Sequence, residues 1–354
     1  MQKHSKKITG VIITFFLILL VMVGCSKGIA GAAPDEYKRH DFAMGTPITQ
    51  RVYGKNGEKA AEQVIEKIRD IESRMTVNAP GGEINHLNDS AGIDGVRLSE
   101  DTLYVLEKAG YYSQLSGGSF DITVGPLIKA WGIVSENSHI PEKQDIQNML
   151  RLVDYRNVSI NKANMTAKLE RKGQNVDLGA IVKGFAGDEA VKIYKENGIN
   201  SAFINLGGNV VVVGNKPDGS HWRIGVQNPR AVNGKYIGII EVSDKAVVTS
   251  GDYERYFESG GKRYHHILDP KTGYPSDSGL ISVTVVSGTS IDADALSTSL
   301  FVMGLEKGYE LAEAINGIEA IFITEQKEVY TTNGLRDSFS FSDESKEYKY
   351  VEKR

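Results

Sequence analysis

Apolar residues recur at three- and four-residue intervals in several stretches, the spacing typical of amphipathic helices. One such run extends from Glu58 to Met75, and a second follows Ser99 and continues to about Ser113. Pro141 opens a third run that ends near Val153, since proline is favoured in a first helical turn. Further helices are predicted from Ala180 to the stop at Gly198, over 293–303 and over 306–315.

Short runs rich in Val, Ile and Tyr lie among these helices and are typical of strands. Several follow one another with no helix between them, which favours antiparallel pairing. The predicted fold class is therefore α+β, with mixed or antiparallel sheets and packed helices. The predicted strands are residues 157–160, 167–170, 202–205, 210–213, 223–226, 236–242, 246–249, 264–268, 281–286 and 320–324.

The N-terminus has the three-part layout of a secretory signal. Three lysines precede an apolar run over residues 11–23 that is too short to span a bilayer and breaks at Gly24. The sequence from Met22 to Cys25 resembles a bacterial lipobox, in which the cysteine is lipidated and becomes the mature N-terminus. Cys25 is the only cysteine, so an intramolecular disulfide is impossible and a lipid anchor is the favoured role.

This layout divides the chain and predicts its location. Residues 1–24 are expected to be a lipoprotein signal peptide and 25–36 a lipid-anchored tether. Residues 37–338 would form the folded domain, and 339–354 a charged C-terminal tail. The protein is expected to be extracytoplasmic and anchored to the bacterial cell membrane.

Charge and glycine content narrow the function classes. The formal net charge is −4, and it becomes −7 without the three signal lysines, with no basic block, so nucleic acid is not expected as a partner. The 38 glycines gather in short clusters between periodic segments, as in tight loops. The sequence contains no dinucleotide-binding fingerprint, Walker A loop or zinc signature.

The stretch 176–184 reads as the end of a strand, a tight turn and the first turn of a helix. Asp177 and Gly179 suit the helix cap and the close-packed turn. Lys183 is a cation near a helix N-terminus, where it opposes the helix dipole unless an anion is bound there. A phosphate cradle is one interpretation. A surface lysine on an ordinary strand–helix unit is the other, and the local pattern alone favours it.

Asp294 and Thr298 are four residues apart on a predicted helix, so both side chains project from one face. A carboxylate and a hydroxyl on one face can hold a hard cation such as Mg²⁺ together with water and phosphate oxygens. The alternative is an aspartate that caps helix amides with a threonine packed behind it.

His265 and His266 precede a turn from Asp269 to Gly273, so they lie where a strand ends. Either could act as a general base or a phosphate partner, although a solvated or packed histidine is as common there. Ser119 lacks the nucleophile-elbow pattern, which argues against a serine hydrolase.

Six motifs, each weak alone, occur in the order found in the ApbE family of FAD:protein FMN transferases, and the chain resembles that family from Met44 to about Gly304. The family is typically secreted and lipid-anchored, in agreement with Cys25. The motifs are Met44–Thr46, Gly117–Pro126, Asp177–Gly184, Asn205–Gly208, His266–Gly273 and Asp294–Thr298.

The resemblance implies an enzyme that splits FAD between its phosphates, releases AMP and links FMN through a phosphoester to a Ser or Thr hydroxyl of an exported acceptor protein. It implies a fold of paired T-fold-like, interleaved halves. It also implies that Mg²⁺ is held by Asp294, Thr298 and the backbone carbonyl of Ala180, and that His266 is the base, with Lys183 assisting. The residues implied to contact FAD are Met44, Ser119, Phe120, Asp121, Asp177, Lys183 and Ile267.

Asn78 stands where family members often carry an aromatic residue, so the partner that stacks on the flavin ring is left open. Ser119 replaces the commoner alanine, a small change.

Two other functions are compatible with these motifs. The first is a Mg²⁺-dependent FAD pyrophosphatase, and the second is a non-catalytic FAD-binding lipoprotein. Having His266, Lys183, Asp294 and Thr298 together argues against storage alone, because binding requires no base.

Overall fold

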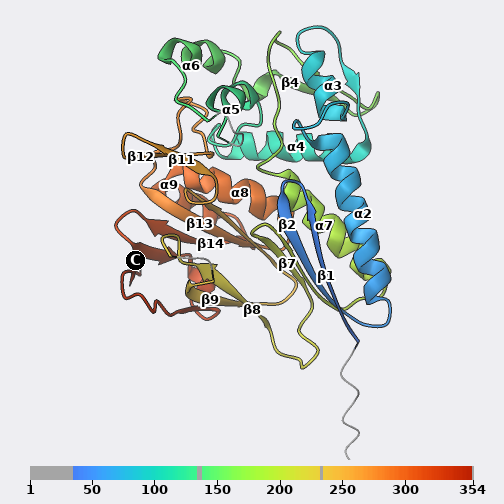
Figure 1. Cartoon of the computed structure of the whole chain (residues 1–354), viewed down its shortest axis with the longest axis vertical. Coiled ribbons are helices and arrows are strands. Elements are labelled where there is room, and N and C mark those ends of the chain that lie inside the picture. Colours follow the sequence, from blue (N-terminus) through green and yellow to red (C-terminus); the bar gives the residue numbers. More distant parts are fainter. Residues whose placement is uncertain (1–34, 134–137, 232–233, 353–354) are drawn as a thin grey trace, which may run out of the picture. The chain divides into compact units, whose positions relative to one another are not determined.

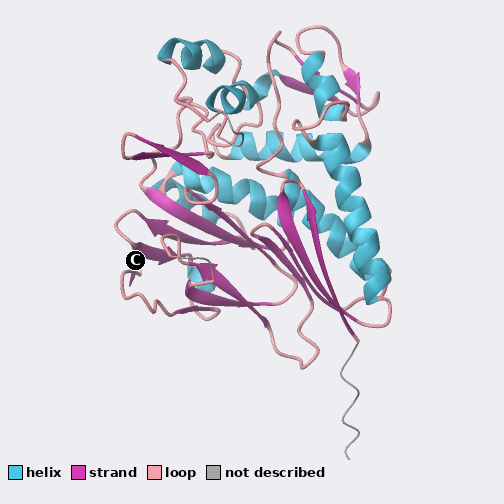
Figure 2. Cartoon of the chain, in the orientation of Figure 1, coloured by secondary structure: helices cyan, strands magenta, loops and turns pink. Residues whose placement is uncertain are grey.

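A computed structural model of the chain describes residues 35–133, 138–231 and 234–352. The predicted signal peptide, Cys25 and nearly all of the predicted tether lie outside the described residues. Helices and mostly antiparallel sheets are mixed along the described part, which confirms the α+β fold class (Figure 2). In these three ranges no helix combines the length and the hydropathy that crossing a membrane requires.

A nine-stranded sheet forms the centre of the domain (Figure 1). Neighbouring strands are antiparallel except for the last pair, β15 and β17, which is parallel. The strands, in order across the sheet, are β1 (Glu36–Ala43), β2 (Thr46–Tyr53), β6 (Ser201–Leu206), β7 (Asn209–Val213), β10 (Ala246–Gly251), β13 (Leu280–Ser287), β14 (Glu319–Thr324), β15 (Glu328–Thr331) and β17 (Lys349–Tyr350).

Both faces of this sheet are covered near its centre, which explains the unbroken valine run of β7. Val211 and Val213 belong to the large apolar cluster beneath the helices. Val210 and Val212 belong to the cluster on the opposite face. Because side chains alternate between the faces of a strand, a strand buried on both faces can be apolar throughout. The opposite face is covered by a three-stranded sheet of β16 (Phe339–Phe341), β9 (Tyr236–Val242) and β8 (Trp222–Gln227).

Four helices cover the other face (Figure 1). Helix α7 packs between α2 and α8, and α8 also contacts β10, β13 and α9. The apolar stripe of α2 is buried as its spacing predicts, from Ala61 to Met75. The helices are α2 (Gly57–Met75), α7 (Val182–Glu196), α8 (Ser290–Met303) and α9 (Leu305–Ala314).

The remaining elements lie beyond the ends of these helices, in the upper part of Figure 1. The fully buried Trp131 of α5 stacks on Tyr264, with ring centroids 5.6 Å apart, and so fixes the β11–β12 hairpin to α5. The elements are α3 (Glu83–Asp89), β3 (Val96–Arg97), α4 (Glu100–Leu115), α5 (Gly125–Trp131), α6 (Lys143–Leu150), β4 (Val158–Asn161), β5 (Thr166–Leu169), β11 (Tyr256–Ser259) and β12 (Lys262–His265).

All six predicted helices are present, with shifted ends. The third begins at Lys143 rather than Pro141, because Glu142 is extended and occupies the N-cap position. The fourth begins at Val182 rather than Ala180. Strands β1 and β2 and helices α3 and α5 were not predicted. The predicted charged tail is part of the fold instead, since β16 pairs with β9 and β17 pairs with β15.

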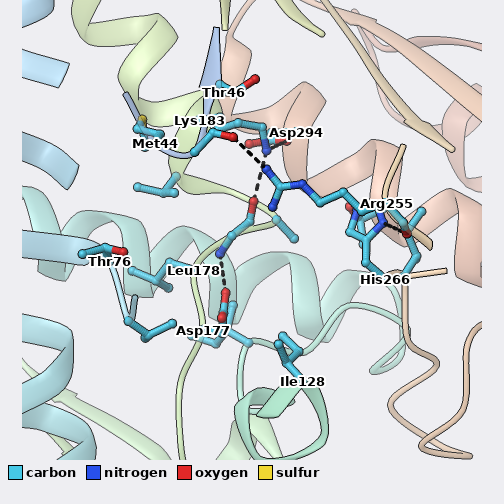
Figure 3. Close-up of a pocket in the computed structure, with 18 of the residues that line it drawn as sticks. Met44, Thr46, Thr76, Ile128, Asp177, Leu178, Lys183, Arg255, His266 and Asp294 are labelled. Atoms are coloured by element: carbon cyan, nitrogen blue, oxygen red, sulfur yellow. Dashed lines mark hydrogen bonds and ion pairs between the residues drawn. The ribbon is translucent and has the colours of Figure 1, made fainter. Parts of the chain in front are cut away.

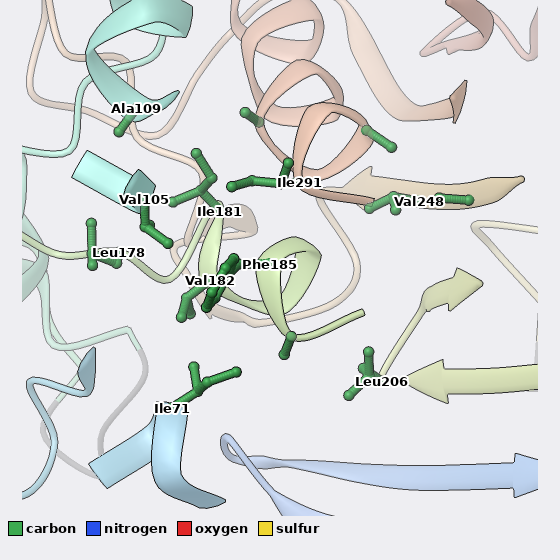
Figure 4. Packing of buried hydrophobic residues seen from close by; sticks show 14 of the residues in the cluster. Ile71, Val105, Ala109, Leu178, Ile181, Val182, Phe185, Leu206, Val248 and Ile291 are labelled. Atoms are coloured by element: carbon green, nitrogen blue, oxygen red, sulfur yellow. The ribbon is translucent and has the colours of Figure 1, made fainter. Parts of the chain in front are cut away.

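Helices α7 and α8 approach closely because glycines of α7 face α8. A Cβ on Gly184 would lie 2.4 Å from the carbonyl oxygen of Ser290 and 2.6 Å from Cα of Ile291. Asp188 of α7 accepts hydrogen bonds from the amides of Ser290 and Ile291, at 2.6 and 3.0 Å, and so caps α8. Figure 4 shows Ile181 and Phe185 of this region packed near Ile291.

We predict that Gly184→Ala separates α7 from α8 and lowers the free energy of unfolding by about 1–3 kcal/mol, because the new Cβ would meet backbone atoms of Ser290 and Ile291 that cannot yield. Gly110→Ala in α4 is the matched control, since nothing lies within 4 Å of its Cβ position. That change should be neutral or stabilise the protein by up to about 1 kcal/mol. Urea unfolding of both variants is the measurement, and equal effects would contradict the close packing.

Candidate active site

One pocket, with a volume of about 820 Å³, brings together residues from distant parts of the chain (Figure 3). It is bounded by the β1–β2 turn, the segment before α7, one face of α8 and the segment after β12. Asn78, at the position where an aromatic was expected, also lines it. The predicted site residues in its wall are Met44, Ser119, Phe120, Asp121, Asp177, Ala180, Lys183, His266, Ile267, Asp294 and Thr298.

Asp177 shapes the turn before α7 but does not cap the helix as predicted. Its Oδ1 accepts a hydrogen bond from the amide of Gly179 at 2.7 Å, and its own amide donates to the carbonyl of Ile122 at 2.8 Å. The N-cap position belongs to Ile181, four residues later. Burial raises the pKa of Asp177, an effect that the nearby Lys183 partly opposes.

The first turn of α7 is joined to α8 through Asp294. Because α7 begins at Val182, the amide of Gly184 lies in the first turn and has no helical carbonyl to donate to. Here that amide donates instead to Oδ2 of the buried Asp294, at 2.8 Å. Among the described residues, the carbonyl of Ala180 accepts no backbone hydrogen bond, so it remains available at the pocket wall. Asp294 therefore does not cap its own helix, a task performed by Asp188.

Lys183 lies in the first turn of α7 and faces the pocket (Figure 3). Its Nζ donates to the carbonyl of Gly179 at 3.1 Å and lies 3.8 Å from Oδ1 of Asp294. The cation thus lies beside a buried carboxylate at the pocket wall, and the phosphate cradle stays a prediction. Thr298, one turn after Asp294, has its Oγ1 3.3 Å from Oγ of Ser250 in β10.

His265 and His266 have different surroundings. His265 is buried, with Nε2 3.1 Å from the carbonyl of Ser276, and it does not line the pocket. His266 lines the pocket, and both its amide and its Nδ1 point at the carbonyl of Arg255, at 3.0 and 3.3 Å. A carbonyl can only accept, so Nδ1 carries the proton and Nε2 of the neutral ring has a free lone pair.

Burial lowers the pKa of His266 to about 3, and the positive charges of Arg255 and Lys183 act in the same direction. The ring is therefore neutral at neutral pH. This is the form that a general base needs.

The β1–β2 turn presents Met44 to the pocket in a strained conformation. Met44 has φ 54°, a left-handed value uncommon for residues other than glycine, and its amide donates to Oε1 of Glu72 at 2.7 Å. Phe120 and Ile267 are almost fully buried and form apolar wall. Backbone strain such as that of Met44 is frequent at functional sites.

The carboxylate of Asp121 binds other groups of the protein rather than facing the pocket with free oxygens. Its carboxylate accepts hydrogen bonds from the amide and hydroxyl of Thr123, at 2.8 and 2.6 Å, and from the amide of Tyr155, at 2.9 Å. Burial raises its pKa despite these bonds. The side chain thereby fixes the loop that carries Ser119 and Phe120 into the pocket wall.

The sequence did not single out several other polar residues of the wall, among them Arg255, Glu254 and Asn209. Asn209 directly follows the Gly207–Gly208 pair, and that adjacency was the available signal. Arg255 and Glu254 lie in a turn between two strands, where no periodicity or motif marks them.

Comparisons with known proteins agree with this arrangement. The model of the ApbE family matches residues 44–322. The FAD:protein FMN transferase of Klebsiella pneumoniae (strain 342) is 36% identical over 304 residues, which cover 86% of this chain and 94% of that protein. The FAD:protein FMN transferase of Treponema pallidum (strain Nichols) is 33% identical over 338 residues, which cover 90% of this chain and 93% of that protein.

Solved structures show the same similarity. The ApbE protein of Thermotoga maritima superposes with a TM-score of 0.80 and 33% identity, over 86% of this chain and 99% of that one. The flavin transferase ApbE from Vibrio cholerae gives a TM-score of 0.78 and 27% identity over the same shares.

Proposed function

Since the chain belongs to the ApbE family and is a flavin transferase, we propose that its pocket binds FAD with the diphosphate at the start of α7 and with Mg²⁺ beside Asp294. The observation that carries this proposal is the convergence of Lys183, Asp294 and His266 in one pocket wall. The acceptor is a Ser or Thr hydroxyl of an exported protein, and AMP is the second product.

The donor atoms of Ala180, before α7, and of Asp294 and Thr298, on α8, fit a magnesium ion. Among the described residues the carbonyl of Ala180 accepts no backbone hydrogen bond and Oδ1 of Asp294 accepts none, while Thr298 offers a hydroxyl. All three are oxygens, the ligands that Mg²⁺ prefers, and the remaining positions suit phosphate oxygens and water. When bound there, the ion would neutralise charge on the diphosphate.

The chain's own residues have separate tasks in the reaction. Lys183 and the positive end of the α7 dipole favour the negative charge that develops on the leaving AMP phosphate. Nε2 of His266 takes the proton of the attacking hydroxyl as its oxygen bonds to the phosphorus of the FMN half. The bond from that phosphorus to the bridging oxygen breaks, and the electron pair leaves with AMP. Met44, Phe120 and Ile267 offer apolar wall to the rings of FAD.

We predict that His266→Ala lowers FMN transfer by about a hundredfold or more, while FAD affinity stays nearly unchanged, because a base acts mainly in the transition state. His221→Ala, an exposed residue outside the pocket, is the control and should alter neither quantity. In-gel flavin fluorescence of a tagged acceptor and a fluorescence titration of FAD are the measurements. Transfer at the parental rate would show that His266 is not the base.

The same assay, run without acceptor, measures how much FAD is hydrolysed to FMN and AMP. Water would then replace the acceptor hydroxyl at the same site. If AMP is released without acceptor as fast as FMN is transferred with acceptor, the result would favour a pyrophosphatase as the main activity. Binding of FAD without either product would favour a storage role.

A second prediction concerns the metal. Three protein oxygens cannot fill an octahedral shell, so Mg²⁺ and FAD should each tighten the binding of the other by the same factor. Asp294→Asn should remove most of this coupling and the Mg²⁺-dependent turnover, while FAD binding through Lys183 survives. Asp292→Asn, on the same helix but outside the pocket, should keep the coupling. The measurement is calorimetric titration of FAD with and without Mg²⁺, and equal affinity in both for the parent would refute the metal site.

We also propose that the protein is extracytoplasmic and lipid-anchored through Cys25. The support comes from the three lysines, the short apolar run and the Gly24-Cys25 junction. Cys25→Ala should leave the protein unprocessed or release it from the membrane, as shown by membrane fractionation and intact mass. Normal processing and retention of this variant would contradict the anchor.

A further inference from the structure

Arg255 contacts His266, the proposed base, through its main chain and lines the pocket itself. It lies directly before β11, and β11 pairs with β12, the strand that leads into His266. Its carbonyl accepts from both the amide and the Nδ1 of His266, at 3.0 and 3.3 Å. The main chain of Arg255 therefore sets the position and the tautomer of the imidazole, whatever its side chain does.

The side chain of Arg255 extends in the other direction, into the pocket and toward Lys183 (Figure 3). Its Nη2 makes one long hydrogen bond, 3.3 Å, to the carbonyl of Gly45 in the β1–β2 turn. Within the described part of the chain, no carboxylate lies within ion-pair distance of this guanidinium. Most of its five N–H donors are thus available to a ligand.

Two neighbouring arginines, unlike Arg255, have carboxylate partners. Arg230 forms two hydrogen bonds of 2.6 Å to Asp252, and Arg263 lies 3.7 Å from Asp252 and 3.5 Å from Glu258. Neither lines the pocket. Arg69 also lines the pocket, but it lies 3.6 Å from Asp41. In the described part of the wall, Arg255 is thus the arginine with no carboxylate within ion-pair distance.

We propose that Arg255 is a second cation for the diphosphate of FAD: with substrate bound, its guanidinium donates hydrogen bonds to phosphate oxygens that Lys183 also faces. A planar guanidinium matches two phosphate oxygens at once, which a lysine cannot do. As the acceptor oxygen bonds to phosphorus and the bridging P–O bond breaks, the electron pair passes to the AMP phosphate. Arg255 then stabilises a charge that grows during the reaction. This inference rests on the proposed binding of FAD in the pocket.

The charges around Arg255 support this role. Its positive charge lowers the pKa of His266 and partly opposes the burial that raises the pKa of Glu254 and of Asp177. Lys183 acts on the same three groups in the same direction. Two cations therefore act on one region of the pocket, and a bound diphosphate with two negative charges would balance them.

The test compares ligands that differ in the diphosphate. FAD and ADP carry it, whereas riboflavin does not, and each is titrated into the parent, Arg255→Met, Arg255→Lys and the control Arg263→Met. For Arg255→Met we expect FAD and ADP to bind about tenfold more weakly or worse, with riboflavin within about twofold of the parent. Arg255→Lys should recover part of the loss, and Arg263→Met should match the parent for every ligand.

Unchanged affinity of Arg255→Met for FAD and ADP would overturn the inference. Equal weakening of FAD, ADP and riboflavin would also overturn it, because it would show a distorted pocket rather than a lost phosphate contact. Measurements on the parent protein distinguish a failure of this inference from a failure of the proposed function. Failure of the parent to bind FAD or to transfer FMN would refute the function itself, whereas normal parental binding with a normal Arg255→Met variant refutes only the role of Arg255.

Discussion

The hydrogen bond from the amide of Gly184 to Asp294 is the interaction on which the site depends. It joins the first turn of α7 to α8 and holds a buried carboxylate at the pocket wall, which the carbonyl of Ala180 also lines. The bond is possible only because Gly184 has no side chain and lets α8 approach. One contact between two helices thus shapes the part of the wall where we propose a cation beside Asp294 and an anion at the start of α7.

The sheet makes that contact rigid. Its central strands are buried on both faces, under α7 and α8 on one side and under the β16–β9–β8 sheet on the other. Further segments of the pocket wall lie at the edges of this sheet. The β1–β2 turn contributes Met44, and the β11–β12 hairpin, fixed to α5 by the stacking of Trp131 on Tyr264, contributes His266 and Arg255. Rigid elements hold each group, and short turns present it.

Sequence periodicity predicted the helices well, because the apolar stripe of α2 and the small residues of α7 are there to be buried. Strand β1 escaped prediction because its run of Lys38, Arg39, His40 and Asp41 alternates between partly and fully exposed positions, with little apolar signal. The local role of Asp177 was mistaken because a cap and an Asp–x–Gly turn use the same residues. Arg255 could not be found at all, since its importance lies in what its side chain faces across the fold. The lipid anchor at Cys25 stays a prediction.

The central claim is that the diphosphate of FAD and a divalent cation meet between α7 and α8. A crystal structure of the protein with FAD and Mn²⁺ in place of Mg²⁺, with anomalous data to locate the metal, tests it most directly. We expect a metal peak bonded to Asp294, Thr298 and the carbonyl of Ala180, with phosphate oxygens completing the shell and the bond from Gly184 to Asp294 retained. A diphosphate bound away from the start of α7, or a metal peak without these ligands, would contradict it.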